Sequence, residues 1–156
     1  MTAPASLVAV ARRLAFVRET EGPNRGAWVS MLQRFAGGRE GDSWCADFVS
    51  FVLDVAHHGQ PPVGRTGSCQ ALLTAGRALG AEVTDPAPED LFLLVNEAGH
   101  AHHCGIVTAA SPLAGIAGNT SPDGLSDNGT GVFEHPITAA PPRIAFLRLK
   151  QKESDE

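Results

Sequence analysis

The spacing of apolar residues changes near residue 80, and this change constrains the fold of the 156-residue chain more than any other feature. Before it, apolar residues recur every three or four positions, as they do on helices with one buried face. This spacing predicts helices over residues 4–20, 27–36, 44–56 and 69–79. Beyond it, short apolar runs bounded by Gly, Pro, Asn and Asp are typical of β-strands. They predict strands over residues 91–95, 102–109, 113–118, 129–135 and 143–149.

Helices that precede strands, rather than alternating with them, predict an α+β fold. We expect the N-terminal helices to pack on a C-terminal antiparallel sheet of about five strands. The length is that of one domain with a sizeable core, which we expect to span residues 1–149. The charged end of the chain, residues 150–156, is expected to be disordered.

Charge and hydropathy argue against two classes of partner. The formal net charge of −5 does not suit a protein that binds nucleic acid by neutralising phosphates. No apolar run approaches the length of a membrane span. In the N-terminal stretch MTAPASLVAVARRLAFVRE, the arginines follow the apolar residues, which is the reverse of a secretory signal. We therefore expect synthesis in the cytoplasm without a signal peptide.

One cysteine stands between a helix start and a buried helical run, in the stretch GDSWCADFVSFVL. Asp42 or Ser43 is the expected N-cap, which would place Cys45 in the first helical turn. Free backbone N–H groups and the positive end of the helix dipole stabilise a thiolate there. Free cysteine is also among the most buried residue types. Cys45 is therefore either a small core residue or a nucleophile, and a nucleophile needs a base.

Candidate bases lie in the stretch HAHHCGIV, residues 100–107. Side chains alternate between the two faces of a strand, so His103 faces one way while His102 and Cys104 face the other. Only one of the two adjacent histidines can point at the sulfur. At least two of His100, His102 and His103 are then ordinary polar strand residues. Gly105 would let another backbone or a substrate come close.

A metal site competes with this interpretation. His100, His102 and Cys104 alternate onto one face and could ligate zinc. No CxxC or HExxH spacing supports this, and a structural zinc site needs four ligands, so we expect no metal and no cofactor. Three cysteines cannot all pair with one another, which favours free thiols in a reducing compartment. We expect Cys69 and Cys104 to be structural, with Cys104 pointing into the core on the face opposite His103.

A third group should orient the base. Asn119, in IAGNTS, follows a predicted strand, and its amide oxygen can accept a hydrogen bond from an imidazole. The order Cys45, His103, Asn119 is then a variant of the nucleophile–base–orienter arrangement. In the plainer interpretation, Asn119 is a turn residue beside a glycine.

The stretches SWCADFVSFVL, HCGIVTA and IAGNTS, in this order, resemble the CHAP family of papain-like cysteine amidohydrolases and peptidases. The resemblance extends to EGPNRG, GSCQALLTAGRALG and the last strands, and so covers most of the chain. It implies helices packed on an antiparallel sheet, with the nucleophile at a helix N-terminus. It also implies that Cys45 is the nucleophile and His103 the general base, and that Asn119 lies near the histidine.

One position departs from the family pattern. Many relatives have a glutamate two residues before the asparagine, and this glutamate orients the histidine. Here the position is Ala117. Either Asn119 alone orients the imidazole, or activity is reduced or lost.

The resemblance implies a peptidoglycan hydrolase, because family members in phage endolysins, tail-associated lysins and bacterial autolysins cut amide bonds there. We expect the substrate to be a stem peptide or a cross-bridge, and the protein to act at the cell wall. A pore, a phage tail or a secretion system would deliver it, which makes tail or injection-device proteins expected partners. Two alternatives stay open. One is a catalytically inactive wall-binding or structural module of such a device, which Ala117 favours, and the other is a peptidase that acts on proteins.

Overall fold

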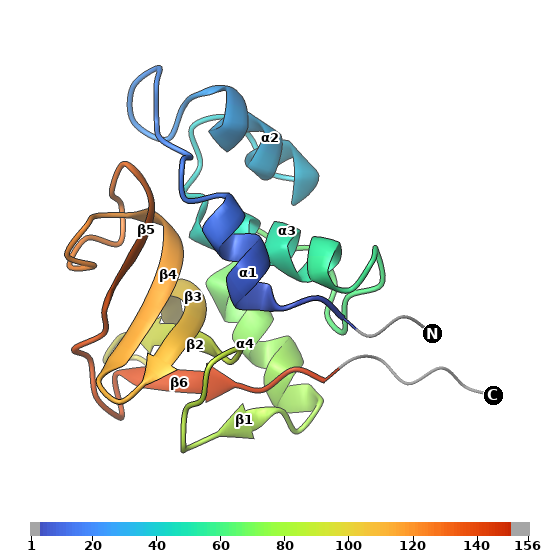
Figure 1. The fold of residues 1–156 in the computed structure, drawn as a ribbon, viewed down its shortest axis with the longest axis vertical. Helices are drawn as coiled ribbons and strands as arrows, with labels where there is room; N and C mark the ends of the chain where they lie inside the picture. The colour runs from blue at the N-terminus through green and yellow to red at the C-terminus, as the bar shows by residue number, and fades with distance from the viewer. Residues whose placement is uncertain (1–3, 151–156) are drawn as a thin grey trace.

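The helices of the protein lie in the first half of the chain and the strands in the second, which confirms the α+β class (Figure 1). The computed structural model describes residues 4–150, so all of the charged end except Lys150 lies outside the described residues. The helices are α1 (Leu7–Arg13), α2 (Ala27–Phe35), α3 (Cys45–Ala56) and α4 (Cys69–Ala78). The strands are β1 (Glu82–Val83), β2 (Leu91–Val95), β3 (Ala101–Ala110), β4 (Leu113–Thr120), β5 (Gly131–Pro136) and β6 (Ile144–Leu147).

The six strands form one antiparallel sheet in the order β1-β6-β2-β3-β4-β5. The expected number was about five, and the strand that was missed is β1. It contributes only Glu82 and Val83, which pair with β6. Two residues are too few to show the alternation by which a strand is recognised.

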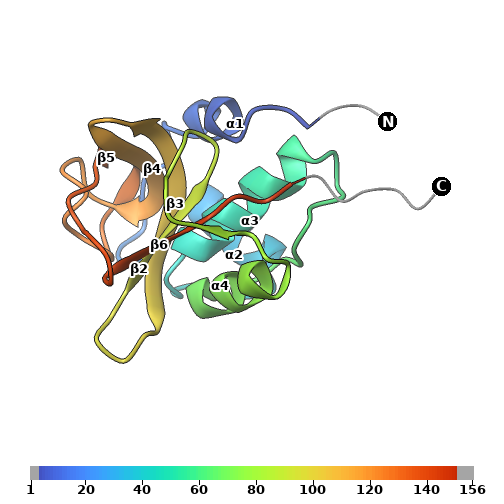
Figure 2. The same ribbon diagram turned by 90° about the horizontal axis from the view of Figure 1, so that it is seen from below.

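The helices gather on one side of the sheet (Figure 2). The side chains of Leu93, Cys104 and Ile116 face this side and belong to the main core. Phe92 and Val107 lie in a smaller apolar cluster on the opposite side, which we call the outer face. Cys104 therefore points into the main core, as the alternation along β3 predicts.

The first helix is shorter than the expected range 4–20, and it ends at Arg13. Val17 has helical spacing in the sequence because it is buried, but its backbone is extended. Its carbonyl accepts a hydrogen bond from the N–H of Val132, 3.1 Å away in β5. Pairing with the sheet thus outweighs the helical preference of this segment.

The start of α1 depends on a distant part of the chain. The hydroxyl of Ser6 caps the helix by accepting from the N–H of Ala9. Glu89, just before β2, accepts hydrogen bonds from the Ser6 hydroxyl and from the N–H of Leu7. A carboxylate beside the first turn satisfies free N–H groups and interacts favourably with the helix dipole.

Within residues 4–150, none of the helices combines the length and the apolar character that a bilayer crossing requires.

Candidate functional site

Cys45 is the first residue of α3, as the sequence predicts to within one residue. The prediction of its N-cap was wrong: the cap is Trp44, whose side chain makes no capping hydrogen bond. The carboxylate of Asp42 instead accepts from the N–H of Arg39 (2.9 Å), within the preceding loop. Because Trp44 does not cap the helix with its side chain, the free N–H groups of the first turn remain available to stabilise a negative charge at Cys45.

Trp44 holds the start of α3 against the sheet. It is fully buried, and its indole N–H donates to the carboxylate of Glu19 (3.0 Å). Gly118 of β4 lies so close that a Cβ there would come within 2.8 Å of the Trp44 ring and of the Phe48 side chain. The position of the thiol is therefore set by tight packing on two sides.

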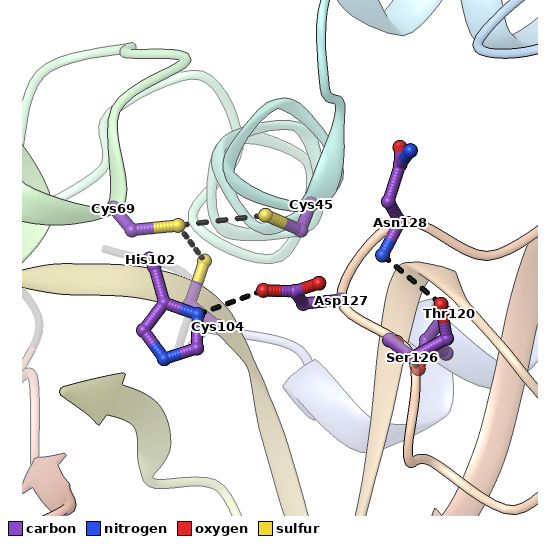
Figure 3. A network of polar contacts seen from close by, with 8 residues as sticks. All are labelled: Cys45, Cys69, His102, Cys104, Thr120, Ser126, Asp127 and Asn128. Carbon is purple, nitrogen blue, oxygen red and sulfur yellow. Dashed lines mark hydrogen bonds and ion pairs between the residues drawn. The ribbon is translucent and has the colours of Figure 1, made fainter. Parts of the chain in front are cut away.

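The structure brings all three cysteines together (Figure 3). The sulfur of Cys69 lies 3.4 Å from the sulfur of Cys45 and 3.4 Å from that of Cys104. All three sulfurs lie within 4.8 Å of one another, and all three residues are buried free thiols. Sequence reasoning missed this thiol cluster, although one sign was present. Cys69 follows the N-cap Ser68 at the start of α4, just as Cys45 begins α3.

The three thiols have very different acidities. Hydrogen bonding by Cys104 and Cys69 holds the pKa of Cys45 well below its usual value, His103 acts in the same direction, and burial opposes them. For Cys69, the hydrogen bond with Cys104 favours the thiolate, but the contact with Cys45 and burial outweigh it and raise the pKa. The pKa of Cys104 is raised by its hydrogen bonds to Cys45 and Cys69 and by burial. Of the three thiols, Cys45 is therefore the one whose surroundings favour the thiolate.

The two adjacent histidines of β3 lie in different environments. His103 is 1% exposed, and its ring packs against Phe92 with 6.3 Å between the ring centroids. It lowers the pKa of the Cys45 thiol, although neither of its ring nitrogens has a well-formed hydrogen bond. His102 is exposed, and its Nδ1 lies 2.9 Å from the carboxylate of Asp127. Of the two histidines, only His103 is among the groups that lower the pKa of Cys45.

Asn119 is fully buried in β4, with a φ of 55°. A positive φ is uncommon outside glycine, and asparagine tolerates it better than most residues. Within residues 4–150, neither atom of its side-chain amide has a hydrogen-bond partner, so the expected bond to His103 is not formed. The pairing of β3 with β4 ends at Ile106 and Ile116. His103 and Asn119 both lie beyond this end of the paired stretch.

Buried polar atoms without partners are rare in folded proteins. His103 and Asn119 both carry such atoms, on neighbouring strands. Ala117 lies in the outer apolar cluster and offers no acceptor. These unpaired groups are available to each other or to a bound substrate.

A second buried histidine, His135 of β5, was missed by sequence reasoning, and no motif marked it. It packs against the same Phe92 ring in an edge-to-face arrangement, with 6.1 Å between centroids. Its Nδ1 lies 2.8 Å from the carbonyl oxygen of Pro136. Burial is the main cause of its lowered pKa, and the nearby charge of His103 contributes.

The zinc set suggested by alternation along β3 is not assembled. Within residues 4–150, the one converging group of three or more possible metal ligands is the thiol cluster, and neither His100 nor His102 belongs to it.

Asp47 lies in the first turn of α3 and is 1% exposed, with one carboxylate oxygen unpaired. Burial and the charge of Cys45 raise its pKa from 3.8 to about 7. At a pH between these two pKa values, Asp47 is therefore protonated in the folded protein and ionised in the unfolded chain. Stability is expected to fall as the pH rises through this window, by about 4 kcal/mol over its whole width and by about 2.5 kcal/mol between pH 5 and pH 8.

We expect Asp47→Asn to remove this pH dependence, because the amide stays neutral. Between pH 5 and pH 8, the Tm of the wild type should fall relative to that of the variant by about 5 °C. Thermal unfolding at both pH values measures the difference. Asp54→Asn, on the same helix, is the matched control and should change the Tm equally at the two pH values. A constant difference between wild type and Asp47→Asn would contradict the prediction.

Comparison of the chain with family models, with curated proteins and with solved structures gives no significant match.

Proposed function

We propose that the protein is a cysteine hydrolase in which Cys45 is the nucleophile and His103 the general acid and base. One observation carries the proposal. A cysteine at the start of a buried helix has its pKa lowered, in part by a buried imidazole from a strand far away in the sequence. A thiolate and an adjacent imidazole are the two groups that nucleophilic cleavage of an amide requires.

The thiolate of Cys45 attacks the carbonyl carbon of the substrate amide and forms a tetrahedral intermediate. Its oxyanion is stabilised by the backbone N–H of Cys45 at the positive end of α3. The protonated imidazole of His103 donates its proton to the leaving nitrogen as the C–N bond breaks, which leaves a thioester. His103 then takes a proton from water, the hydroxide attacks the thioester, and the C–S bond breaks to release the acid and the Cys45 thiolate.

Asn119 is proposed to steady the imidazole during these steps. Its buried amide has both a donor and an acceptor without partners, and His103 has two ring nitrogens in the same state. A small rotation of either side chain that joined them would fix the tautomer of the imidazole. The hydrogen bond would then form in the substrate complex, as catalytic hydrogen bonds often do.

The proposed substrate is peptidoglycan, at an amide bond of the stem peptide or the cross-bridge. This part of the proposal rests on the resemblance of SWCADFVSFVL, HCGIVTA and IAGNTS to the CHAP family, with its papain-like arrangement. We further propose that the protein acts at the cell wall as a lysin of a phage or a phage-like device, which would carry it there.

The direct test compares the wild type with Cys45→Ala on purified sacculi. We expect the wild type to solubilise the sacculi and to expose new amino groups. The variant should lose at least about 10³-fold in rate, because the nucleophile is gone. His102→Ala, at an exposed neighbour of His103, is the matched control and should retain activity. Equal clearing by Cys45→Ala and the wild type would contradict the proposal, and mass analysis of the fragments identifies the bond that is cut.

Ala117 favours a second candidate, a catalytically inactive wall-binding or structural module. The oxygen that would accept from His103 is absent at Ala117, and Asn119 does not replace it in this structure. Labelling with a thiol-reactive probe across pH 5–9 discriminates between the two. Selective labelling of Cys45 well below pH 8 supports the hydrolase, whereas slow and equal labelling of all three cysteines supports the inactive module.

A further inference from the structure

We propose that Cys45, Cys69 and Cys104 together bind a soft monovalent metal cation, Cu(I), in a three-sulfur site. These residues are the only cysteines of the chain, and they come from three separate elements, α3, α4 and β3. All three sulfurs lie within 4.8 Å of one another, although 24 and 35 residues separate them along the sequence. The site does not depend on the proposed hydrolase activity.

The distances fit a shared metal ion. A metal–sulfur bond of about 2.3 Å in a trigonal plane separates the sulfurs by about 4 Å. The two shorter sulfur–sulfur distances here are 3.4 Å, and none exceeds 4.8 Å. Small changes of side-chain rotation would therefore equalise the three edges around one ion. A disulfide would join only two of the three sulfurs and would not explain why the third lies beside them.

The fold also supplies positive potential at the cluster. Both α3 and α4 begin with a cysteine of the cluster, so its sulfurs lie near the N-terminal ends of two helices. Each N-terminus corresponds to about half a positive charge. A complex of one Cu(I) with three thiolates has a net charge of −2, and two helix ends would stabilise this charge inside the protein.

Metal binding displaces protons from the thiols, and this release of protons can be measured. Cu(I) forms three bonds to sulfur and displaces the protons that the thiols carry. Protons are therefore released as the ion binds, and the affinity should fall as the pH is lowered.

The number and type of donors select the ion. Thiolate ligands favour Cu(I), zinc and iron–sulfur clusters. Structural zinc sites take four protein ligands in a tetrahedron. In residues 4–150, no histidine, aspartate, glutamate or further cysteine joins the three sulfurs. Three thiolates without a fourth donor match the trigonal coordination that Cu(I) accepts.

Binding should also control the sulfur of Cys45. A metal ion held by Cys45 withholds this sulfur from any other reaction. The metal-bound state and the hydrolytic state are therefore mutually exclusive, and Cu(I) is expected to inhibit hydrolysis reversibly. Cys45 and Cys69 are 4% and 7% exposed, so an ion can approach from their side, whereas Cys104 is completely enclosed.

The test is an anaerobic titration of the reduced, full-length protein with Cu(I), in competition with a chromophoric Cu(I) chelator. We expect one ion per chain, and X-ray absorption should show three sulfur neighbours at about 2.3 Å. Cys69→Ser and Cys104→Ser keep the size of the side chain and should each weaken binding at least 100-fold. His102→Ala controls for binding by exposed histidines and should stay within threefold of the wild type.

Several outcomes would overturn the site. Binding by Cys104→Ser as tight as that of the wild type would reduce it to a two-thiol contact. Nitrogen neighbours in the X-ray absorption spectrum, or a preference for Zn(II) at four-coordinate geometry, would also overturn it. The spectrum is measured on the wild type, so the result stands even where a variant fails to fold.

The titration separates this proposal from the hydrolase. His103 lies outside the cluster of possible ligands. The variant His103→Ala should therefore lose hydrolysis but still bind one Cu(I) per chain with three sulfur neighbours. A wild type that binds Cu(I) but does not cleave sacculi would contradict only the hydrolase. One that cleaves sacculi without binding Cu(I) would contradict only the metal site.

Discussion

Replacement of His103 by alanine is expected to lower the rate of amide hydrolysis about 10³-fold. The imidazole has two tasks in the proposed mechanism, because it favours the Cys45 thiolate and then delivers a proton to the leaving nitrogen. His102→Ala is the matched control, since His102 is the neighbouring residue on the same strand but is exposed and paired with Asp127. Initial rates of fragment release from sacculi measure the effect.

A second readout distinguishes a chemical role of His103 from a structural one. Since His103 lowers the pKa of Cys45, its removal should shift the pH profile of Cys45 labelling to higher pH. A folded His103→Ala variant with unchanged rate and an unchanged labelling profile would refute the assignment of the base. A lost rate with an unchanged labelling profile would leave His103 the proton donor but not the group that favours the thiolate.

Gly105→Val is expected to destabilise the protein by about 3 kcal/mol, through overpacking. A Cβ at Gly105 would lie 2.5 Å from the carbonyl oxygen of Ile116 and 2.6 Å from the ring of Phe92. The first of these contacts is backbone, so it cannot be relieved by rotating a side chain. The sequence predicts such a close approach from a glycine within a strand. In a chain of this length the Tm should fall by about 10 °C.

The control for this substitution is Gly64→Ala, because a Cβ at Gly64 would meet nothing within 4 Å. It should change the Tm by only a degree or two. Thermal unfolding followed by circular dichroism measures both variants. A Tm for Gly105→Val close to that of the wild type would mean that β3 and β4 can separate there at little cost.

The fold class could be predicted because apolar spacing reports burial, and burial is what distinguishes helix from strand in most of this chain. The prediction failed where a residue is buried by something other than the helix or strand that its spacing indicates. Val17 is buried as an extended segment paired with β5, and its spacing alone could not show this. The two-residue strand β1 has no pattern of its own, and it exists because β6 offers a free edge.

The candidate site was predictable to the extent that it depends on local geometry. The place of Cys45 on α3 and the opposite orientations of His103 and Cys104 follow from helix and strand periodicity. The thiol cluster could not be predicted in this way. Its members meet only because α3 and α4 pack on the same face of β3, and that is a matter of tertiary packing. The same holds for His135, which reaches Phe92 from another strand.

The cap of α1 has a consequence for the order in which the protein assembles. Glu89 bonds to the N–H of Leu7, 82 residues earlier in the chain. During synthesis, the first helix emerges from the ribosome long before the carboxylate that completes its first turn. A nascent chain that ends before the lead-in to β2 therefore lacks this contact, and the opening segment gains its final anchorage only when the sheet begins to form.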